Sequence, residues 1–153
     1  MFHKMRNFKR ELPKEEVMEL LKNGEYGILS TVGGDGYPYG IPVNYVYADN
    51  KIGFHCAPDA GHKLENIKFN SRVCFTVVGD TEILPSKFST KYESAVVFGT
   101  VHEAEDKKKI LELLVDKYSS QFKKEGMEYI SRSAGKTGVY VIEIEHVTGK
   151  GRR

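Results

Sequence analysis

The sequence of 153 residues has the size of one ordinary domain and is long enough to bury a hydrophobic core. Hydrophobic residues make up 40% and charged residues 29%, which excludes a disordered chain and indicates a globular protein. The net charge of +2 is too small to indicate nucleic-acid binding by itself. Basic residues gather at 1–10 and 148–153, which we expect to be solvated tails of a single domain over 1–153.

The sequence carries no sign of a membrane span or an export signal. No apolar run approaches the length of a bilayer, and the residues from Met1 to Glu11 lack the apolar core of a signal peptide. We therefore expect a cytoplasmic protein. The two cysteines, Cys56 and Cys74, fit reduced thiols better than a disulfide framework.

Helical features follow the first basic segment. Pro13 suits a first helical position, Glu15 and Glu16 suit the positive end of the helix dipole, and Gly24 provides a stop. These features predict a helix over 12–23 that packs as a cap on a sheet.

Two β-hairpins are expected next. Alternating apolar residues and turn-forming glycines predict strands over 26–32, 37–47 and 51–57, the first two joined by a Gly-Gly-Asp-Gly turn. Pro38 and Pro42 lie on the same side of the middle strand and lack backbone donors, so one edge of that strand cannot form a full ladder. We expect this strand at a sheet margin, or where a barrel splits open to a ligand.

The second half of the sequence adds helices to the sheet. The predicted elements are a helix over 60–69 capped by Asp59, a strand over 72–78, a polar loop over 79–92, a strand over 94–102, a helix over 103–123 and a strand over 137–147. In the long helix Leu111, Leu114, Tyr118 and Phe122 share one face, which we expect to be core. Six strands with early hairpins favour a small closed or split barrel over a doubly wound sheet.

The stretch from Ile52 to Ile67 runs from an apolar strand through a turn into an amphipathic helix. Backbone N–H groups at the start of a helix lack internal partners and favour anions. Gly61 permits close approach of the backbone, and Lys63 adds a positive charge beside the free amides. This arrangement predicts a phosphate site, although a plain strand, loop and surface lysine would have the same pattern.

Other chemical motifs are weak or missing. His55, Cys56, His62 and Cys74 are metal-ligand types, but neighbouring strand residues point to opposite faces, so we expect no metal site. Without a partnered base, Cys56 is expected to be a buried, unreactive thiol. His55 is either a satisfied core histidine or a group beside the phosphate site. The sequence has no P-loop, no dinucleotide-binding fingerprint and no nucleophile elbow.

Three blocks of sequence lie in an order and spacing typical of one family. They are Gly27–Val32 with Asp35–Tyr39 and Ile41–Tyr45, Phe54–Ala57 with Gly61–Ile67, and Lys91–Gly99. Over about residues 1–147 the sequence resembles the pyridoxamine 5'-phosphate oxidase-like FMN-binding split-barrel proteins, specifically the nitroimidazole-resistance (Nim-type) branch. The resemblance implies a mainly β (α+β) fold, namely a six-stranded, largely antiparallel split β-barrel with flanking helices.

The resemblance also implies a homodimer that binds FMN at its interface. Backbone groups expected to line the flavin ring belong to Ser30, Thr31, Val43, Asn44 and Tyr45. Residues expected to hold the ribityl phosphate are His55, Cys56, Ala57, His62 and Lys63. The other subunit is expected to contribute Tyr92, Ser94 and Val96. No nucleic acid and no membrane is expected as a partner.

The basic residues of the expected phosphate site depart from one part of the family. Pyridoxal-producing oxidases hold the FMN phosphate and a phosphorylated substrate with several basic residues, whereas here Lys63, helped by His62, is the one good candidate. We therefore expect an FMN-dependent oxidoreductase that passes electrons from reduced nicotinamide to a small acceptor such as a nitroaromatic compound, with His55 as the candidate catalytic residue. Alternatives are a non-catalytic flavin-binding or storage protein, a split barrel that binds haem or a deazaflavin, and a structural dimer with an empty pocket.

Overall fold

A computed structural model describes all residues from Met1 to Arg153. The strands are β1 Gly27–Val32, β2 Pro38–Val43, β3 Val46–Ala48, β4 Lys51–Cys56, β5 Arg72–Val78, β6 Glu82–Leu84, β7 Ser89–Glu103 and β8 Gly138–Arg152. The α-helices are α1 Lys14–Asn23, α2 His62–Phe69, α3 Lys107–Tyr118 and α4 Lys123–Ser133. Short 3-10 helices are η1 Phe8–Arg10, η2 Pro85–Lys87, η3 Ser120–Phe122 and η4 Ala134–Lys136. None of the helices combines the length and the apolar composition that crossing a membrane requires.

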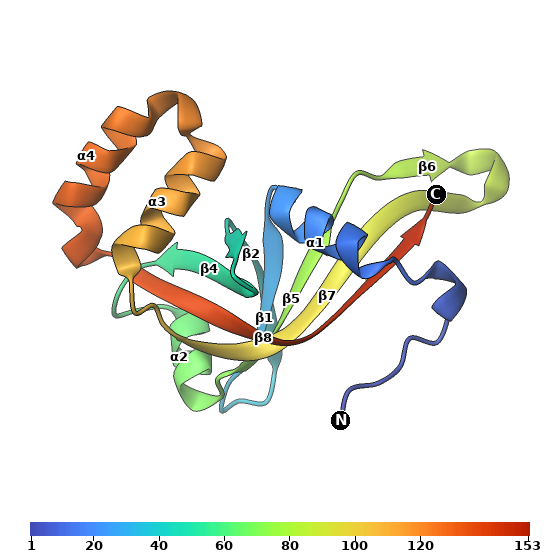
Figure 1. Ribbon diagram of the computed structural model, residues 1–153. Coiled ribbons are helices and arrows are strands. Elements are labelled where there is room, and N and C mark those ends of the chain that lie inside the picture. The colour runs from blue at the N-terminus through green and yellow to red at the C-terminus, as the bar shows by residue number, and fades with distance from the viewer.

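The strands form a curled antiparallel sheet with helices around it (Figure 1). Their order is β2-β1-β5-β7-β8-β4-β3, and β6 pairs with β7 to one side. Because β2 and β3 are consecutive in the chain yet lie at opposite ends of this order, the barrel is split between them. The prediction of a mainly β, largely antiparallel split barrel with flanking helices is confirmed, while the predicted number of six strands is too low.

The predicted continuous strand over 37–47 is wrong, because the chain leaves one ladder and joins another. β2 pairs with β1 as far as Val43, and β3 pairs with β4 from Val46 onward. β2 itself has a neighbour only on its β1 side. The expected position of the proline-containing strand at a sheet margin is therefore confirmed, since an edge strand tolerates missing donors on one side.

The inward-facing residues of the strands and helices form the main core. Leu29, Phe75 and Val97, from β1, β5 and β7, are fully buried and alternate with outward-facing residues along each strand. Leu21 of α1 and Leu64 of α2 pack into the same cluster. These contacts place both helices against the barrel, as expected for caps on a sheet.

The start of α2 differs from the prediction. Its N-cap is Gly61, with φ of 117°, and no side chain caps the helix. The predicted cap by Asp59 is wrong because the helix begins two residues too late for that carboxylate to reach its first amides. The left-handed backbone at this position suits glycine.

The strands β7 and β8 are longer than predicted. Residues 79–92 contain β6, η2 and the beginning of β7 instead of a polar loop, and residues 148–152 belong to β8 instead of a tail. Together with β6 these strand ends form an arm that projects beyond the barrel (Figure 1). This arm was not predicted from the local sequence, because its strands are stabilised by pairing with residues far away in the chain.

The predicted helix over 103–123 is also wrong in extent, because the chain leaves the helical path after Tyr118. Leu111 and Leu114 are buried as expected, and they form a smaller core cluster with Ile130 of the unpredicted helix α4. Phe122 is 60% exposed in η3, so its predicted place in the core is wrong. The two helices form a hairpin at one end of the molecule (Figure 1).

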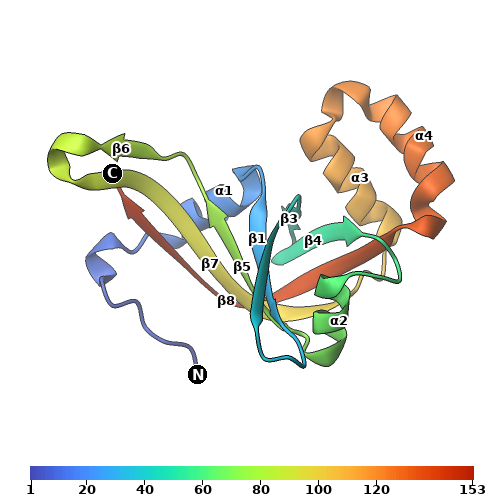
Figure 2. The ribbon, with the colours of Figure 1, turned by 180° about the vertical axis from the view of Figure 1, so that it is seen from behind.

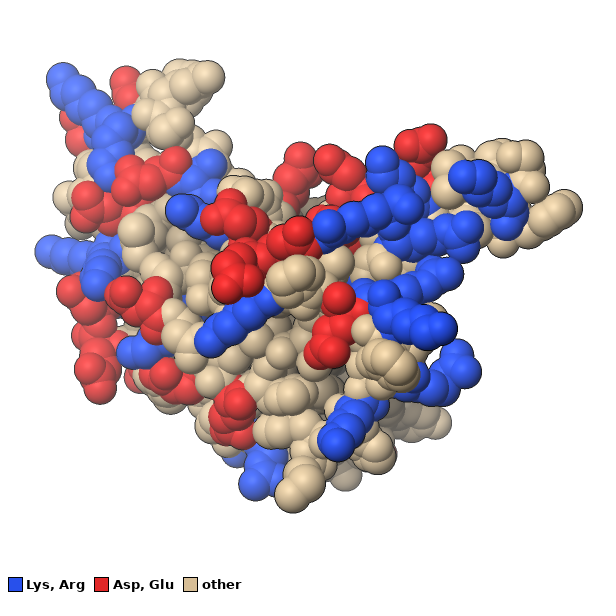
Figure 3. Space-filling view, turned by 45° about the vertical axis from the view of Figure 1, so that its right-hand side comes forward, with Lys and Arg blue, Asp and Glu red and all other residues tan.

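Both basic ends of the chain lie on the same side of the molecule. Glu11 forms a β-bridge with Lys150, and Arg153 forms ion pairs with Glu16 and Glu93. In Figure 3, Lys and Arg side chains gather on this side, beside the β6–β7 arm. The N-terminal segment is not simply solvated, since the ring of Phe2 stacks on that of His146 with centroids 4.5 Å apart.

Candidate functional site

The start of α2 presents free backbone donors to an open surface. Its first hydrogen-bonded amide is that of Glu65, which donates to the carbonyl of Gly61 at 3.1 Å, so the amides before it lack a helical acceptor. A Cβ added to Gly61 would meet no atom within 4 Å. Lys63 lies half-buried in this first turn, and His62 is exposed. The helix start can therefore receive an anion.

The end of β4 brings two more of the expected residues to this place. Desolvation by the surrounding side chains, and then the charge of Lys63, lowers the pKa of His55, so its imidazole is neutral at pH 7. Because His55 is exposed, it is not the core histidine that the apolar strand would accommodate. An uncharged imidazole offers one donor and one acceptor to a ligand.

The thiol of Cys56 is half-buried beside the same lysine. Burial raises its pKa, and the charge of Lys63 offsets this shift only in part, so the thiol is protonated at pH 7. The next residue, Ala57, is exposed and follows the last pair of the β4–β8 ladder. The expectation of an unreactive thiol agrees with this environment.

Two side-chain contacts join α2 to the free edge of the barrel. Tyr39 of β2 stacks on His62 with ring centroids 3.9 Å apart. Asn66 donates to Thr31 Oγ1 at 3.0 Å, and both residues are buried. Figure 2 shows α2 beside the turn between β1 and β2. The predicted phosphate end and the predicted ring end are thus neighbours within one chain.

The residues expected to line the ring differ in accessibility. Ser30 and Val43 are half-buried, and Asn44 is exposed between β2 and β3. Thr31 and Tyr45 are 2% and 0% exposed, so their side chains belong to the core. A ligand can reach these two residues only through their backbone.

The residues expected from a second subunit lie on the outer face of β7. Tyr92, Ser94 and Val96 are half-buried there, alternating with the fully buried Ala95 and Val97. β5 stands between β7 and β1, so one chain does not bring all the expected residues into one site.

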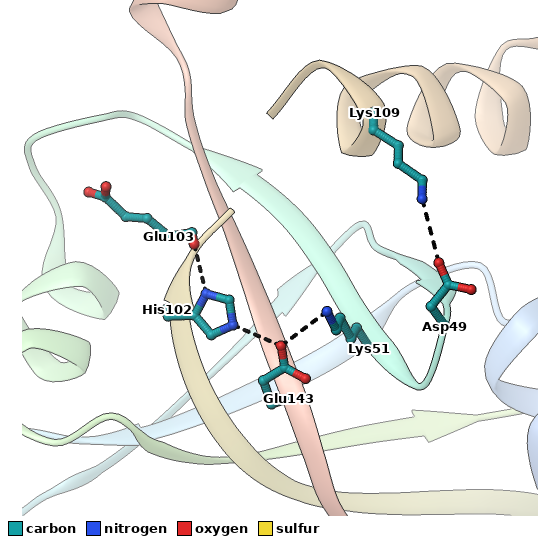
Figure 4. A network of polar contacts seen from close by, with 6 residues as sticks. All are labelled: Asp49, Lys51, His102, Glu103, Lys109 and Glu143. Atoms are coloured by element: carbon teal, nitrogen blue, oxygen red, sulfur yellow. Dashed lines mark hydrogen bonds and ion pairs between the residues drawn. The ribbon is translucent and has the colours of Figure 1, made fainter. Parts of the chain in front are cut away.

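Two cavities, of about 310 and 390 Å³, lie away from the start of α2. The smaller one lies between α3 and the strands β3, β4 and β8, and Figure 4 shows a network of polar contacts in its lining. Glu143 accepts from Lys51 at 3.3 Å and from His102 at 2.9 Å, and Lys109 pairs with Asp49 at 3.5 Å. Because each of these side chains already has a partner, the cavity presents none of them free to a ligand.

Two residues at the candidate site were not singled out from the sequence. Tyr39 and Asn66 fall inside the motif blocks, but neither has a residue type that marks a role. Their contacts with His62 and Thr31 join segments that are 23 and 35 residues apart in the sequence. The proline pattern of β2 was a usable signal for Tyr39, since it indicated that this strand lies at a free edge.

The fold is a split antiparallel barrel, with an exposed helix start beside its edge strand. A family model described as pyridoxamine 5'-phosphate oxidase matches residues 13–151. The chain belongs to the pyridoxamine 5'-phosphate oxidase family, as its sequence motifs predicted. No curated protein matches the sequence.

Several solved structures share the fold. A candidate 5-nitroimidazole antibiotic resistance protein from Bacteroides thetaiotaomicron is 23% identical with a TM-score of 0.77, covering 92% of this chain and 85% of its own. An FAD-binding protein from Mesorhizobium loti is 23% identical with a TM-score of 0.66, covering 94% and 98%. An FAD and heme binding protein from Mycobacterium smegmatis is 19% identical with a TM-score of 0.79, covering 94% and 74%. At these identities the likeness shows a common fold.

Proposed function

We propose that this protein is a homodimeric, FMN-binding oxidoreductase. The observation that carries the proposal is the open start of α2, where free amides and Lys63 adjoin the free edge strand β2 through the Tyr39–His62 stack. A flavin mononucleotide has an anionic end and a planar aromatic end, and these two neighbouring features match that chemistry.

The residues at the start of α2 are suited to bind the phosphate group of FMN. The uncapped amides of α2 are donors for phosphate oxygens, Gly61 leaves room for close approach, and Lys63 supplies a full positive charge. A neutral His55 would hold its proton for a hydrogen bond without adding a second charge. Pyridoxamine-phosphate oxidation is not part of the proposal, because a single lysine suits one phosphate better than two.

The ring end would be formed by backbone groups at the split of the barrel. Pairing of β2 with β1 stops at Val43, and pairing of β3 with β4 starts at Val46. Asn44 and Tyr45 therefore lie outside both ladders. The peptide groups of Asn44 are candidates for hydrogen bonds to a flavin ring, because those of Tyr45 already bond to Tyr118 and Lys117.

The homodimer is supported by an unpartnered sheet face. The outward positions of β1, β5 and β7 include the half-buried Ile28 and Val96, and Val78 and Phe98 are 53% and 39% exposed. A second copy seated on this face would cover apolar surface and could bring its own Tyr92, Ser94 and Val96 to the flavin.

When bound, the flavin supplies hydride and electron transfer, and the protein supplies binding and orientation. We propose reduced nicotinamide as the donor and a small acceptor such as a nitroaromatic compound, with His55 as the side chain that holds or receives a proton beside the site. The structural neighbour assigned to 5-nitroimidazole resistance supports this choice of acceptor. Cytoplasmic location is part of the same proposal.

The absorption spectrum of the purified protein tests the function. We expect flavin absorption, either as isolated or after FMN is added, and release of FMN when the protein is denatured. Release of FAD instead of FMN would identify FAD as the cofactor, and a haem Soret band would favour the haem-binding alternative. A protein that binds FMN but does not oxidise reduced nicotinamide with any acceptor would be a flavin-binding or storage protein. Absence of bound cofactor under all of these conditions would reject the proposal.

A further inference from the structure

The backbone of Tyr45 is held by a helix that is far away in the sequence. Tyr45 lies between β2 and β3, its ring is fully buried, and its hydroxyl donates to the carbonyl of Leu21. The ring also packs edge-on against Phe75 with centroids 5.0 Å apart. The side chain is therefore fixed in the core, while the peptide groups on either side belong to neither sheet ladder.

The last two residues of α3 satisfy those peptide groups. The N–H of Tyr45 donates to the hydroxyl of Tyr118 at 3.1 Å, and the Nζ of Lys117 donates to the carbonyl of Tyr45 at 3.0 Å. The Tyr118 hydroxyl lies 2.5 Å from the carbonyl of Glu25 and 3.1 Å from that of Tyr45. Because a hydroxyl has one proton, the shorter contact to Glu25 takes it, and Lys117 remains as the donor for the Tyr45 carbonyl.

Lys117 occupies an unusual place for a lysine on a surface helix. Its Nζ lies 3.7 Å from the centroid of the Tyr45 ring, and no carboxylate forms an ion pair with it. Burial lowers its pKa to about 8. The ammonium therefore depends on the carbonyl and the ring face of one residue, Tyr45, for its stabilisation.

We propose that Lys117 and Tyr118 are positioning residues for the β2–β3 break, the two residues Asn44 and Tyr45 that belong to neither ladder. They hold the backbone of this break in the conformation that the ring end of the ligand needs. Without these contacts, the two peptide groups of Tyr45 would need other partners, and the path of the chain between β2 and β3 would no longer be fixed. The effect on ligand binding rests on the flavin site proposed above. The effect on the backbone is independent of any ligand.

Hydrogen exchange of the ligand-free protein tests the backbone effect. Tyr118→Phe removes the acceptor of the Tyr45 amide, and we expect the protection of this amide to fall by roughly three- to tenfold, the effect of losing one neutral hydrogen bond. Lys117→Met removes a charge-assisted hydrogen bond to the carbonyl of the same residue, and we expect the protection to fall by roughly threefold or more. Lys108→Met and Tyr129→Phe are matched controls on exposed sites of α3 and α4, and they should leave this amide unchanged. Unchanged protection in both test variants, with the thermal midpoint retained, would overturn the proposal.

Flavin binding tests the positioning role. Lys117→Met and Tyr118→Phe should weaken riboflavin and FMN by the same factor, because the contacts concern the ring and not the phosphate. Wild-type affinity for riboflavin should also fall as the pH rises through about 8, and Lys117→Met should not show this step.

Equal affinity in wild type and variants, or identical pH profiles, would reject the role in binding even if exchange becomes faster. If the wild-type protein binds no flavin, the proposed function fails, and the exchange measurement alone decides whether the β2–β3 break is held by α3.

Discussion

The two ends of the candidate site are built in opposite ways. The phosphate end is a helix start with exposed residues, no side-chain cap and one lysine. The ring end is a strand break whose central residue, Tyr45, is completely buried and bonded to residues up to 73 positions away. Substitutions at the start of α2 should therefore cost little stability, whereas substitutions at Tyr45 should affect the fold and, under the proposed function, ligand binding as well.

The largest contrast is expected in stability. Tyr45→Ala should lower the free energy of unfolding by roughly 3–5 kcal/mol, because it removes a fully buried aromatic ring and leaves a cavity. Tyr37→Ala, at a site that is 75% exposed, is the matched control and should change it by roughly 0.5 kcal/mol or less. Chemical denaturation of both variants measures the difference, and equal effects would contradict the distinction between the two regions.

The sheet face that would complete the site is the next target. Val96→Asp should weaken the proposed dimer by roughly 30-fold or more, because an unpaired carboxylate would be buried in the interface. Val96→Thr keeps the β-branched shape and should leave the dimer largely intact. Sedimentation across a range of protein concentrations measures the dissociation constant of the dimer. A wild-type protein that stays monomeric at all of these concentrations would show that this face is not a dimer interface.

The phosphate end should show an effect on ligand selectivity without an effect on stability. Lys63→Ala is expected to weaken FMN by roughly 10- to 100-fold, the contribution of one charge-assisted hydrogen bond, and to leave riboflavin unchanged. Lys68→Ala, in the last turn of the same helix, is the control. Equal loss for both flavins would place Lys63 away from the phosphate.

A pH dependence of stability is expected from Lys117. The pKa of Lys117 is about 8 in the folded protein and 10.5 ordinarily, so the unfolded chain binds more protons at this site between these values. Relative to Lys117→Met, the wild-type protein should gain stability as the pH rises from 8 to 10.5, because the cost of burying a charge disappears. Denaturation of both proteins at several pH values tests the sign, and a parallel pH dependence would contradict it.

The contrast between the two ends also explains what could be predicted from the sequence. The hairpin turn, the edge strand with Pro38 and Pro42, and the residues around Lys63 are local patterns, and each was assigned to the correct segment. The number of strands and the β6–β7 arm were missed, because pairing between distant strands outweighs local propensity there. Helix α4 was missed as well, and it is held by packing of Ile130 against Leu111 and Leu114 of α3.

The hydrogen bonds that Lys117 and Tyr118 form with the backbone of Tyr45 could not be predicted from local patterns. Lys117 and Tyr118 have the sequence appearance of an ordinary amphipathic helix end, and Tyr118 was assigned to the core face. Their polar contacts arise only because the C-terminal end of α3 meets the β2–β3 break in space. The family resemblance, and not side-chain type or periodicity, indicated the backbone of Val43, Asn44 and Tyr45, and the role of this backbone in binding a ligand stays a prediction.

Titration of FMN and riboflavin into the ligand-free protein, followed by flavin fluorescence, tests the central claim most directly. A site with a separate phosphate end and ring end predicts saturable binding of both flavins at one flavin per chain, with FMN bound more tightly than riboflavin. Failure to bind either flavin, or equal affinity for the two, would contradict the assignment of the start of α2 as a phosphate site.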